Sequence, residues 1–216
     1  MMNKLNNSYY PFDKIIIAYC KVMIILILIF GRPLVNYVDE LFTYSIAAAI
    51  AILLPLTLNE SQGRLSAFFR LMYSVILFGI FYRTTGGTMF LVSDHFFDNQ
   101  VVAFETSLYT MEPTLYIDYF LLSPMLNEIF SFCYFCYYLM IPAFLIALFV
   151  KKDYGVLKRY LTAASLTYAV SFLIFSLYPV ESPRWHFEGQ YLNNIDGYLF
   201  RHLVELVIGK GGLHGG

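Results

Sequence analysis

Residues 129–150 read IFSFCYFCYYLMIPAFLIALFV and contain no charged side chain. An α-helix needs about 20 mainly apolar residues to cross the hydrocarbon core of a bilayer, and this run is long enough. Three more apolar runs precede it in the chain, and one follows. We therefore predict an all-α, polytopic transmembrane helix bundle with spans at about 14–30, 41–58, 67–82, 129–150 and 160–178.

The composition agrees with a membrane protein. Of the 216 residues, 59% are hydrophobic, 19% aromatic and 13% charged, whereas an ordinary soluble domain has about 25% charged residues. The net charge of -1 gives no electrostatic reason to expect a nucleic-acid partner. We expect membrane lipid to be the main partner.

The distribution of Lys and Arg predicts the orientation, because positively charged loops stay in the cytoplasm. Lys151, Lys152, Lys158 and Arg159 lie between the last two spans. With these inside, the N-terminus is cytoplasmic, and residues 1–216 form a single membrane domain with outer loops at 83–128 and 179–216. Lys21 interrupts the first span, and a lysine in hydrocarbon is costly unless it reaches the interface or a partner.

The first outer loop has the pattern of an interfacial helix. Four apolar residues recur with helical spacing, and two acids lie on an adjacent stripe. We expect this helix to lie in the headgroup layer with its acids in water, either as a packing lid or as a substrate gate. The residues are Phe97, Val101, Phe104 and Leu108, with Asp98 and Glu105.

Cys133 and Cys136 form a C-x-x-C within the fourth span. No second pair and no nearby His completes a metal site. We interpret both as small buried helix residues, and we expect no metal.

The segment YPVESPRWH, residues 178–186, follows the last span. Its two prolines end the helix and stiffen the exit, which would hold Arg184 and His186 at the membrane surface with Trp185 as an interfacial anchor. The planar donor fork of an arginine matches phosphate oxygens in pairs, so Arg184 is a candidate phosphate ligand. The alternative is an interfacial arginine that only contacts lipid phosphates or caps a helix end.

The sequence closes on GKGGLHGG, residues 209–216. Glycines allow backbone N–H groups to approach an anion, so Lys210 and His214 are further candidates for a phosphate cradle, although such a tail is also typical of a flexible terminus. The stretch lacks the spacing of a P-loop. His202 lies three residues before Glu205, so the two could share one helix face as an orienting pair.

A multi-span helical region, the segment 178–186, a loop, a short apolar helix and the glycine-rich end, in this order, resemble the type 2 phosphatidic acid phosphatase superfamily. The resemblance is closest to its inositol phosphorylceramide synthase-like branch. The resemblance implies hydrolysis or transfer of a lipid phosphate or pyrophosphate on the outer face through a phosphohistidine, without metal or cofactor. Arg184 matches the phosphate-binding arginine of the first signature, whereas Leu177 stands where that signature has Lys. His186, Trp185 and His202 are then candidates for lining the pocket.

The second and third family signatures, which supply the proton-donating and nucleophilic histidines, are absent from this sequence. We therefore expect an N-terminal portion of a bacterial cell-membrane enzyme whose catalytic residues lie beyond Gly216, and no turnover by this chain. The residues do not separate hydrolase from transferase, and they leave the oligomeric state open.

Two other enzyme classes fit less well. A CDP-alcohol phosphotransferase needs Ala, Gly and Asp where this sequence has Phe200, Lys210 and His214. A membrane protease would need a G-x-S-x-G or H-E-x-x-H motif, which is missing. The non-enzymatic alternative is a membrane scaffold or transport component, and the absence of the catalytic histidines from this sequence favours it as well.

Overall fold

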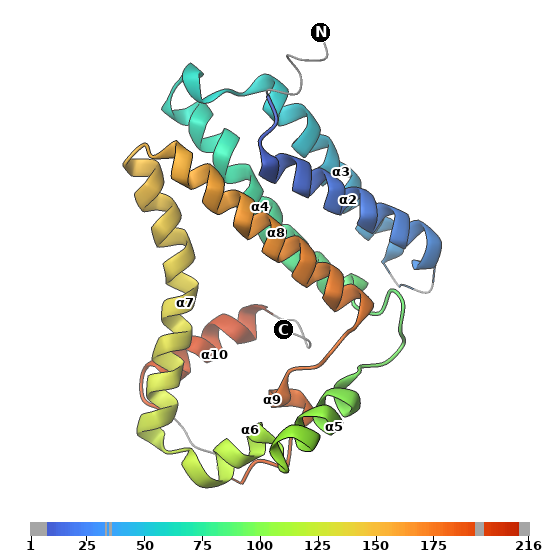
Figure 1. Ribbon diagram of the computed structural model, residues 1–216, viewed down its shortest axis with the longest axis vertical. Helices are drawn as coiled ribbons and strands as arrows, with labels where there is room; N and C mark the ends of the chain where they lie inside the picture. The colour runs from blue at the N-terminus through green and yellow to red at the C-terminus, as the bar shows by residue number, and fades with distance from the viewer. Residues whose placement is uncertain (1–7, 33, 35, 193–196, 212–216) are drawn as a thin grey trace. The chain divides into compact units, whose positions relative to one another are not determined.

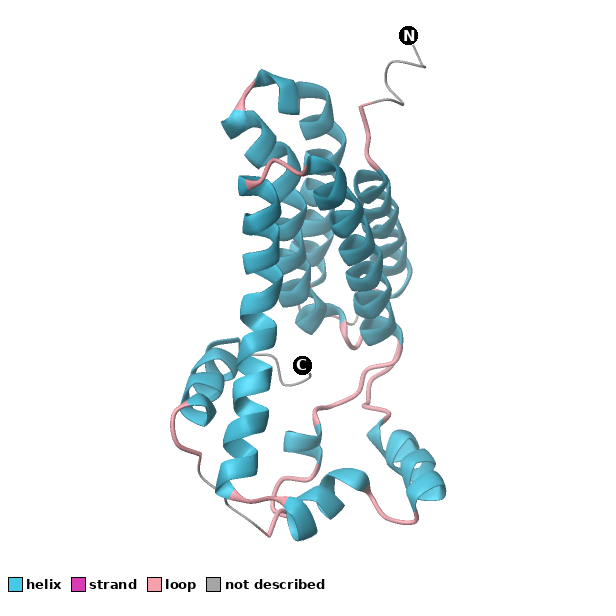
Figure 2. Cartoon of the chain, turned by 60° about the vertical axis from the view of Figure 1, so that its left-hand side comes forward, coloured by secondary structure: helices cyan, strands magenta, loops and turns pink. Residues whose placement is uncertain are grey.

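The computed structural model describes residues 8–32, 34, 36–192 and 197–211, with side chains in the last helix as far as Leu206. Within these residues the chain forms helices, turns and loops and no β-strand (Figures 1 and 2), so the all-α prediction is confirmed. The chain divides into two compact units. Unit 1 comprises Met1–His95 and Leu148–Pro179, and unit 2 comprises Phe96–Ala147 and Val180–Gly216.

Unit 1 is a helix bundle. It contains α2 (Pro11–Phe30), α3 (Tyr37–Thr57), the short 3₁₀ helix η1 (Glu60–Gln62), α4 (Arg64–Thr88) and α8 (Tyr154–Leu177). α2 packs against α3 and α8, and α4 also packs against both (Figure 1).

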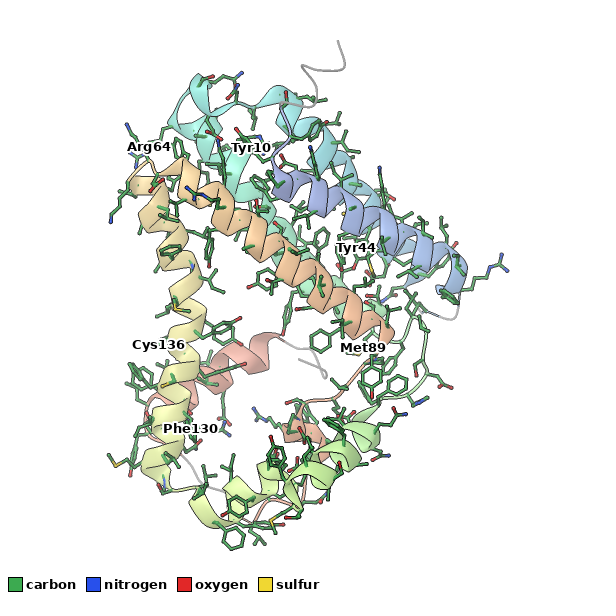
Figure 3. The ribbon with its side chains drawn as sticks, viewed as in Figure 1. Tyr10, Tyr44, Arg64, Met89, Phe130 and Cys136 are labelled. Atoms are coloured by element: carbon green, nitrogen blue, oxygen red, sulfur yellow. The ribbon has the colours of Figure 1, made fainter. Side chains whose placement is uncertain are left out.

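Buried aromatic rings form the centre of this bundle. The Tyr19 ring lies 5.8 Å from that of Tyr44 and 5.1 Å from that of Phe81, between ring centroids. These three side chains come from α2, α3 and α4, and Figure 3 labels Tyr44. The rings exclude water from the core and bring three helices together.

A buried ion pair joins α2 to α4. The Arg70 guanidinium donates to the two Asp13 carboxylate oxygens at 3.0 and 2.6 Å and to the Ser8 carbonyl at 3.1 Å. The Tyr73 hydroxyl also donates to Asp13. Asp13 and Arg70 are 0% and 2% exposed, and a buried charge is tolerated only when it is paired in this way.

Four of the described helices are long and apolar enough to cross a membrane, namely α3, α4, α8 and α7 (Pro124–Val150). They contain the predicted spans 41–58, 67–82, 160–178 and 129–150, with ends that differ by a few residues. The predicted span 14–30 is helical as part of α2, but this helix carries three charged residues, Asp13, Lys14 and Lys21, and is not among the four. A fifth crossing by α2 stays a prediction.

Unit 2 contains most of α7 together with α5 (Asp98–Tyr109), α6 (Pro113–Tyr116), the π-helical turn η2 (Ile117–Leu121), α9 (Pro183–His186) and α10 (Phe200–Gly211). Phe200 packs against Phe132 and Phe135 of α7, with ring centroids 4.8 and 5.8 Å away.

The two cysteines of α7 are both free thiols. Cys133 is exposed and Cys136 is partly buried, and Figure 3 labels Cys136 and Phe130 on this helix. The expectation that both are buried is therefore wrong for Cys133, because protein covers only part of the surface of α7.

Candidate functional site

Arg184 lies on the short helix α9, whose first residue is Pro183. The fixed φ of proline suits the first position of a helix, where no N–H bond is lost. The Tyr191 hydroxyl donates to the Pro183 carbonyl at 2.8 Å, which anchors this turn from the following segment. Pro183 therefore places Arg184 on a defined turn, and its position at the membrane surface stays a prediction.

Two buried acids of the 96–128 segment hold the chain on either side of α9. Both Asp98 carboxylate oxygens accept the backbone N–H of Glu181, at 3.0 and 2.9 Å. An Asp118 oxygen accepts the backbone N–H of Leu192 at 2.8 Å. Arg184 lies between these two anchor points, so the acids position the segment that carries it.

The interfacial-helix prediction needs a correction at Asp98. α5 forms where the spacing predicts it, but Asp98 is only 7% exposed whereas Phe104 is 64% and Leu108 is 58% exposed. The acid turns inward because it binds a backbone N–H, while Phe104 and Leu108 of the apolar stripe face outward and Phe97 and Val101 are half-buried. An outward apolar stripe is what a helix needs to contact the headgroup layer.

Glu128, near the start of α7, caps α10. Its carboxylate accepts the backbone N–H groups of Tyr198, Leu199 and Phe200 at 2.8, 2.8 and 2.6 Å. The N–H groups of Leu199 and Phe200 are among the unpaired donors of the helix N-terminus, where a negative charge is favourable. Gly197 leaves the room for this contact, because a Cβ there would lie 2.8 Å from a Glu128 oxygen and 2.2 Å from the Arg201 Cβ.

With the N-terminus of α10 held by Glu128, two arginines form ion pairs with one carboxylate of this helix. A Glu205 oxygen lies 2.8 Å from an Arg201 nitrogen and 3.6 Å from an Arg184 nitrogen. The three side chains are 30%, 44% and 40% exposed for Arg201, Arg184 and Glu205. We call these three residues the arginine cluster. It carries two positive charges and one negative charge, and its guanidinium groups remain open to solvent.

The pKa of Tyr191 is shifted by burial and by the charged groups around the arginine cluster. Burial raises the pKa of Tyr191, and the charges of Glu112 and Asp118 raise this pKa further, while Arg184 lowers it. The tyrosine therefore stays protonated and keeps donating to Pro183.

The other predicted site residues are only partly gathered here. Trp185 lies beside Arg184, whose guanidinium carbon is 5.7 Å from the indole centroid, and His186 stands edge-on to Phe187 at 4.8 Å. His202 is exposed on α10. Glu205 forms its ion pairs with Arg184 and Arg201. The backbone of Gly209, Lys210 and Gly211 is helical, the Lys210 side chain is not described, and His214 lies outside the described residues.

Sequence reasoning missed Arg201, Glu128 and Asp118. Arg201 and Glu205 have the i,i+4 spacing of a helical ion pair, which was a usable signal. Glu128 and Asp118 bind backbone N–H groups 70 and 74 residues away in the chain, and no side-chain pattern in the sequence predicts such partners.

Fold and site together define an all-α protein with helices of membrane-spanning length and an open arginine cluster. The PAP2 superfamily model matches residues 99–204, a range that begins in α5, ends in α10 and includes Arg184 and Arg201. The match supports this superfamily, whose members act on lipid phosphates. Comparisons with curated proteins and with solved structures found no match.

Proposed function

We propose that this protein binds the phosphate of a membrane lipid phosphate at the arginine cluster, with Arg184 as the principal ligand. The observation that carries the proposal is the geometry of Arg184, Arg201 and Glu205. Two guanidinium groups approach one carboxylate, at 3.6 and 2.8 Å, so the cluster keeps one uncompensated positive charge. A phosphate oxygen can accept from the exposed Arg184 fork without displacing the Arg201–Glu205 pair.

The PAP2 superfamily match supports a lipid phosphate as the ligand, since both arginines lie inside the matched range. Phosphoryl transfer requires a nucleophile and a proton donor as well as charge stabilisation. The sequence printed here lacks both histidine signatures of the superfamily. We therefore assign phosphate binding to these residues and expect no turnover.

The proposed orientation puts the N-terminus in the cytoplasm and Arg184 at the outer surface. Lys151, Lys152, Lys158 and Arg159 would then stay inside, as the positive-inside tendency requires. Pro179 lies two residues after the end of α8, so the chain would leave the outer end of that span towards α9.

Vesicle binding tests the ligand assignment. The full chain is compared on phosphatidylcholine vesicles with and without phosphatidic acid, and phosphate release is measured in the same samples. We expect binding that depends on phosphatidic acid, with no phosphate released. Arg184→Gln should reduce this binding about tenfold, since a charge-assisted hydrogen bond contributes about 1.5–3 kcal/mol, and Arg184→Lys should retain part of it because lysine keeps the charge without the fork.

Arg159→Gln is the matched control, because Arg159 is an exposed arginine of unit 1. Equal losses in the Arg159 and Arg184 variants would refute Arg184 as a specific ligand. Binding that does not change in Arg184→Gln would favour a non-catalytic scaffold or transport component. Robust phosphate release that is abolished by changing His202 or His214 would overturn the expectation of no turnover.

A further inference from the structure

Lys21 stands in the middle of α2, between Pro11 and Phe30, and the arginine cluster gives it no role. Its side chain is exposed, as is that of Lys14 two turns earlier. A lysine at this depth of an apolar helix needs the interface or an anionic partner. Among the described residues, neither lysine takes part in an ion pair.

The two lysines line the same groove in unit 1. It has a volume of about 300 Å³ and is lined by Tyr9, Lys14, Ile17, Ala18 and Lys21. Residues 14, 18 and 21 follow helical spacing and share one face of α2, and the small side chain of Ala18 leaves space between the two lysines. The Tyr9 hydroxyl donates to the Ile52 carbonyl of α3 at 2.8 Å, which fixes one wall of the groove.

The nearest acid in the chain does not neutralise this groove. Asp13 is fully buried on another face of α2 and is bound by Arg70 at 2.6 Å. Lys14 and Lys21 therefore give the groove two positive charges.

The same face of α2 becomes apolar beyond Lys21. Ile25 is 55% and Leu28 is 58% exposed, and they continue the 14, 18, 21 stripe with spacings of four and three. Cations followed by an exposed apolar stripe match a molecule with an anionic head and hydrocarbon tails. A free anion would use only the first half of this surface.

We propose that this groove binds an anionic phospholipid, with its headgroup phosphate between Lys14 and Lys21 and its acyl chains along Ile25 and Leu28. The site is distinct from the arginine cluster, since its residues belong to unit 1 and those of the cluster to unit 2. Basic pockets beside membrane helices take such headgroups through the attraction of each lysine for anionic lipid.

Lipid retention by the delipidated full chain in detergent tests this proposal. Phosphatidylglycerol is titrated and bound lipid is counted by native mass spectrometry, with phosphatidylcholine and inorganic phosphate as comparison probes. We expect preferential binding of phosphatidylglycerol. Lys14→Gln and Lys21→Gln should each weaken it about fivefold, which corresponds to about 1 kcal/mol per lysine, whereas Lys21→Arg should preserve it.

Ala18→Leu tests the shape of the groove separately from its charge, because leucine fills the space between the lysines and both lysines are kept. This variant should also lose the preference for phosphatidylglycerol, while Lys151→Gln, at an exposed lysine outside the groove, should not. All variants are compared at unchanged helix content and elution volume. The proposal is overturned if the Lys14 and Lys21 double variant binds phosphatidylglycerol like the wild type, if Lys151→Gln loses as much, or if inorganic phosphate binds as tightly as the lipid.

Discussion

Asp98 should control the order of the Arg184 segment, although it never contacts Arg184 itself. Its carboxylate accepts the Glu181 N–H at 3.0 and 2.9 Å, and its side chain is buried. A net hydrogen bond to a charged group contributes about 1.5–3 kcal/mol. If Asp98→Ala removes this bond, the segment that contains α9 should open roughly ten to a hundred times more often, since 1.4 kcal/mol is a factor of ten.

Amide hydrogen exchange measures that opening. The Trp185 and His186 N–H groups bond to the Ser182 carbonyl at 2.9 and 3.1 Å, so their exchange reports on α9. Asp98→Asn should give a smaller acceleration, because the amide oxygen still accepts but carries no charge. Phosphatidic acid binding should weaken in the same order, because a looser segment must be ordered again upon binding.

Asp94→Ala is the control for this prediction. Asp94 is a nearby acid that is 99% exposed and pairs with His95. Its removal should leave the exchange of α9 unchanged. The reasoning is refuted if Asp98→Ala does not accelerate exchange at Trp185 and His186, or if Asp94→Ala accelerates it equally.

Three further predictions concern packing and charge. Gly197→Ala should uncap α10, because the new Cβ would lie 2.2 Å from the Arg201 Cβ; loss of exchange protection in α10 would show it. Arg70→Met should lower the free energy of unfolding of unit 1 by about 3–5 kcal/mol, the usual cost of leaving one partner of a buried ion pair uncompensated. A change within experimental error would contradict the pairing. Burial and the Glu112 carboxyl raise the pKa of Glu105 above its ordinary 4.5, so the folded state binds this proton more tightly than the unfolded state. Stability should then fall as the pH rises from 4.5 through the raised pKa, and Glu105→Gln should flatten that part of the thermal-stability profile.

The helices were predictable because their apolar cores are visible in the sequence, but their ends were not. α4 was predicted to stop at Tyr82 and continues to Thr88. The hydroxyls of Thr84 and Thr85 donate to carbonyls one turn earlier, at 2.9 and 2.7 Å, which satisfies polar side chains inside the helix. Thr88 and Ser176 also bond to each other at 3.2 Å. Hydropathy counts such residues as the end of a span, whereas local hydrogen bonding continues the helix.

The candidate site was predictable only where its residues lie close together in the sequence. Arg184 and its prolines lie in one short stretch, so residue type and backbone restriction identify them together. The sequence offers both His202 and Arg201 as partners for Glu205, because spacings of three and four are both compatible with a helical pair; the structure pairs Glu205 with Arg201. The charge of the arginine favours the spacing of four. Glu128 bonds to backbone groups from Tyr198 onward, and backbone donors have no signature in a sequence.

The positive charge of the arginine cluster follows from what the neighbouring acids do. Asp98, Asp118 and Glu128 could each have paired with an arginine, but each is engaged by backbone N–H groups. Among the described residues, Glu205 is the carboxylate that forms ion pairs with Arg184 and Arg201. Two guanidinium groups that share one carboxylate leave a local excess of one positive charge within the cluster. Asp98, Asp118 and Glu128 thus stabilise the backbone of this region, and the Arg184 side chain, 44% exposed and 3.6 Å from Glu205, keeps donors free for a phosphate oxygen.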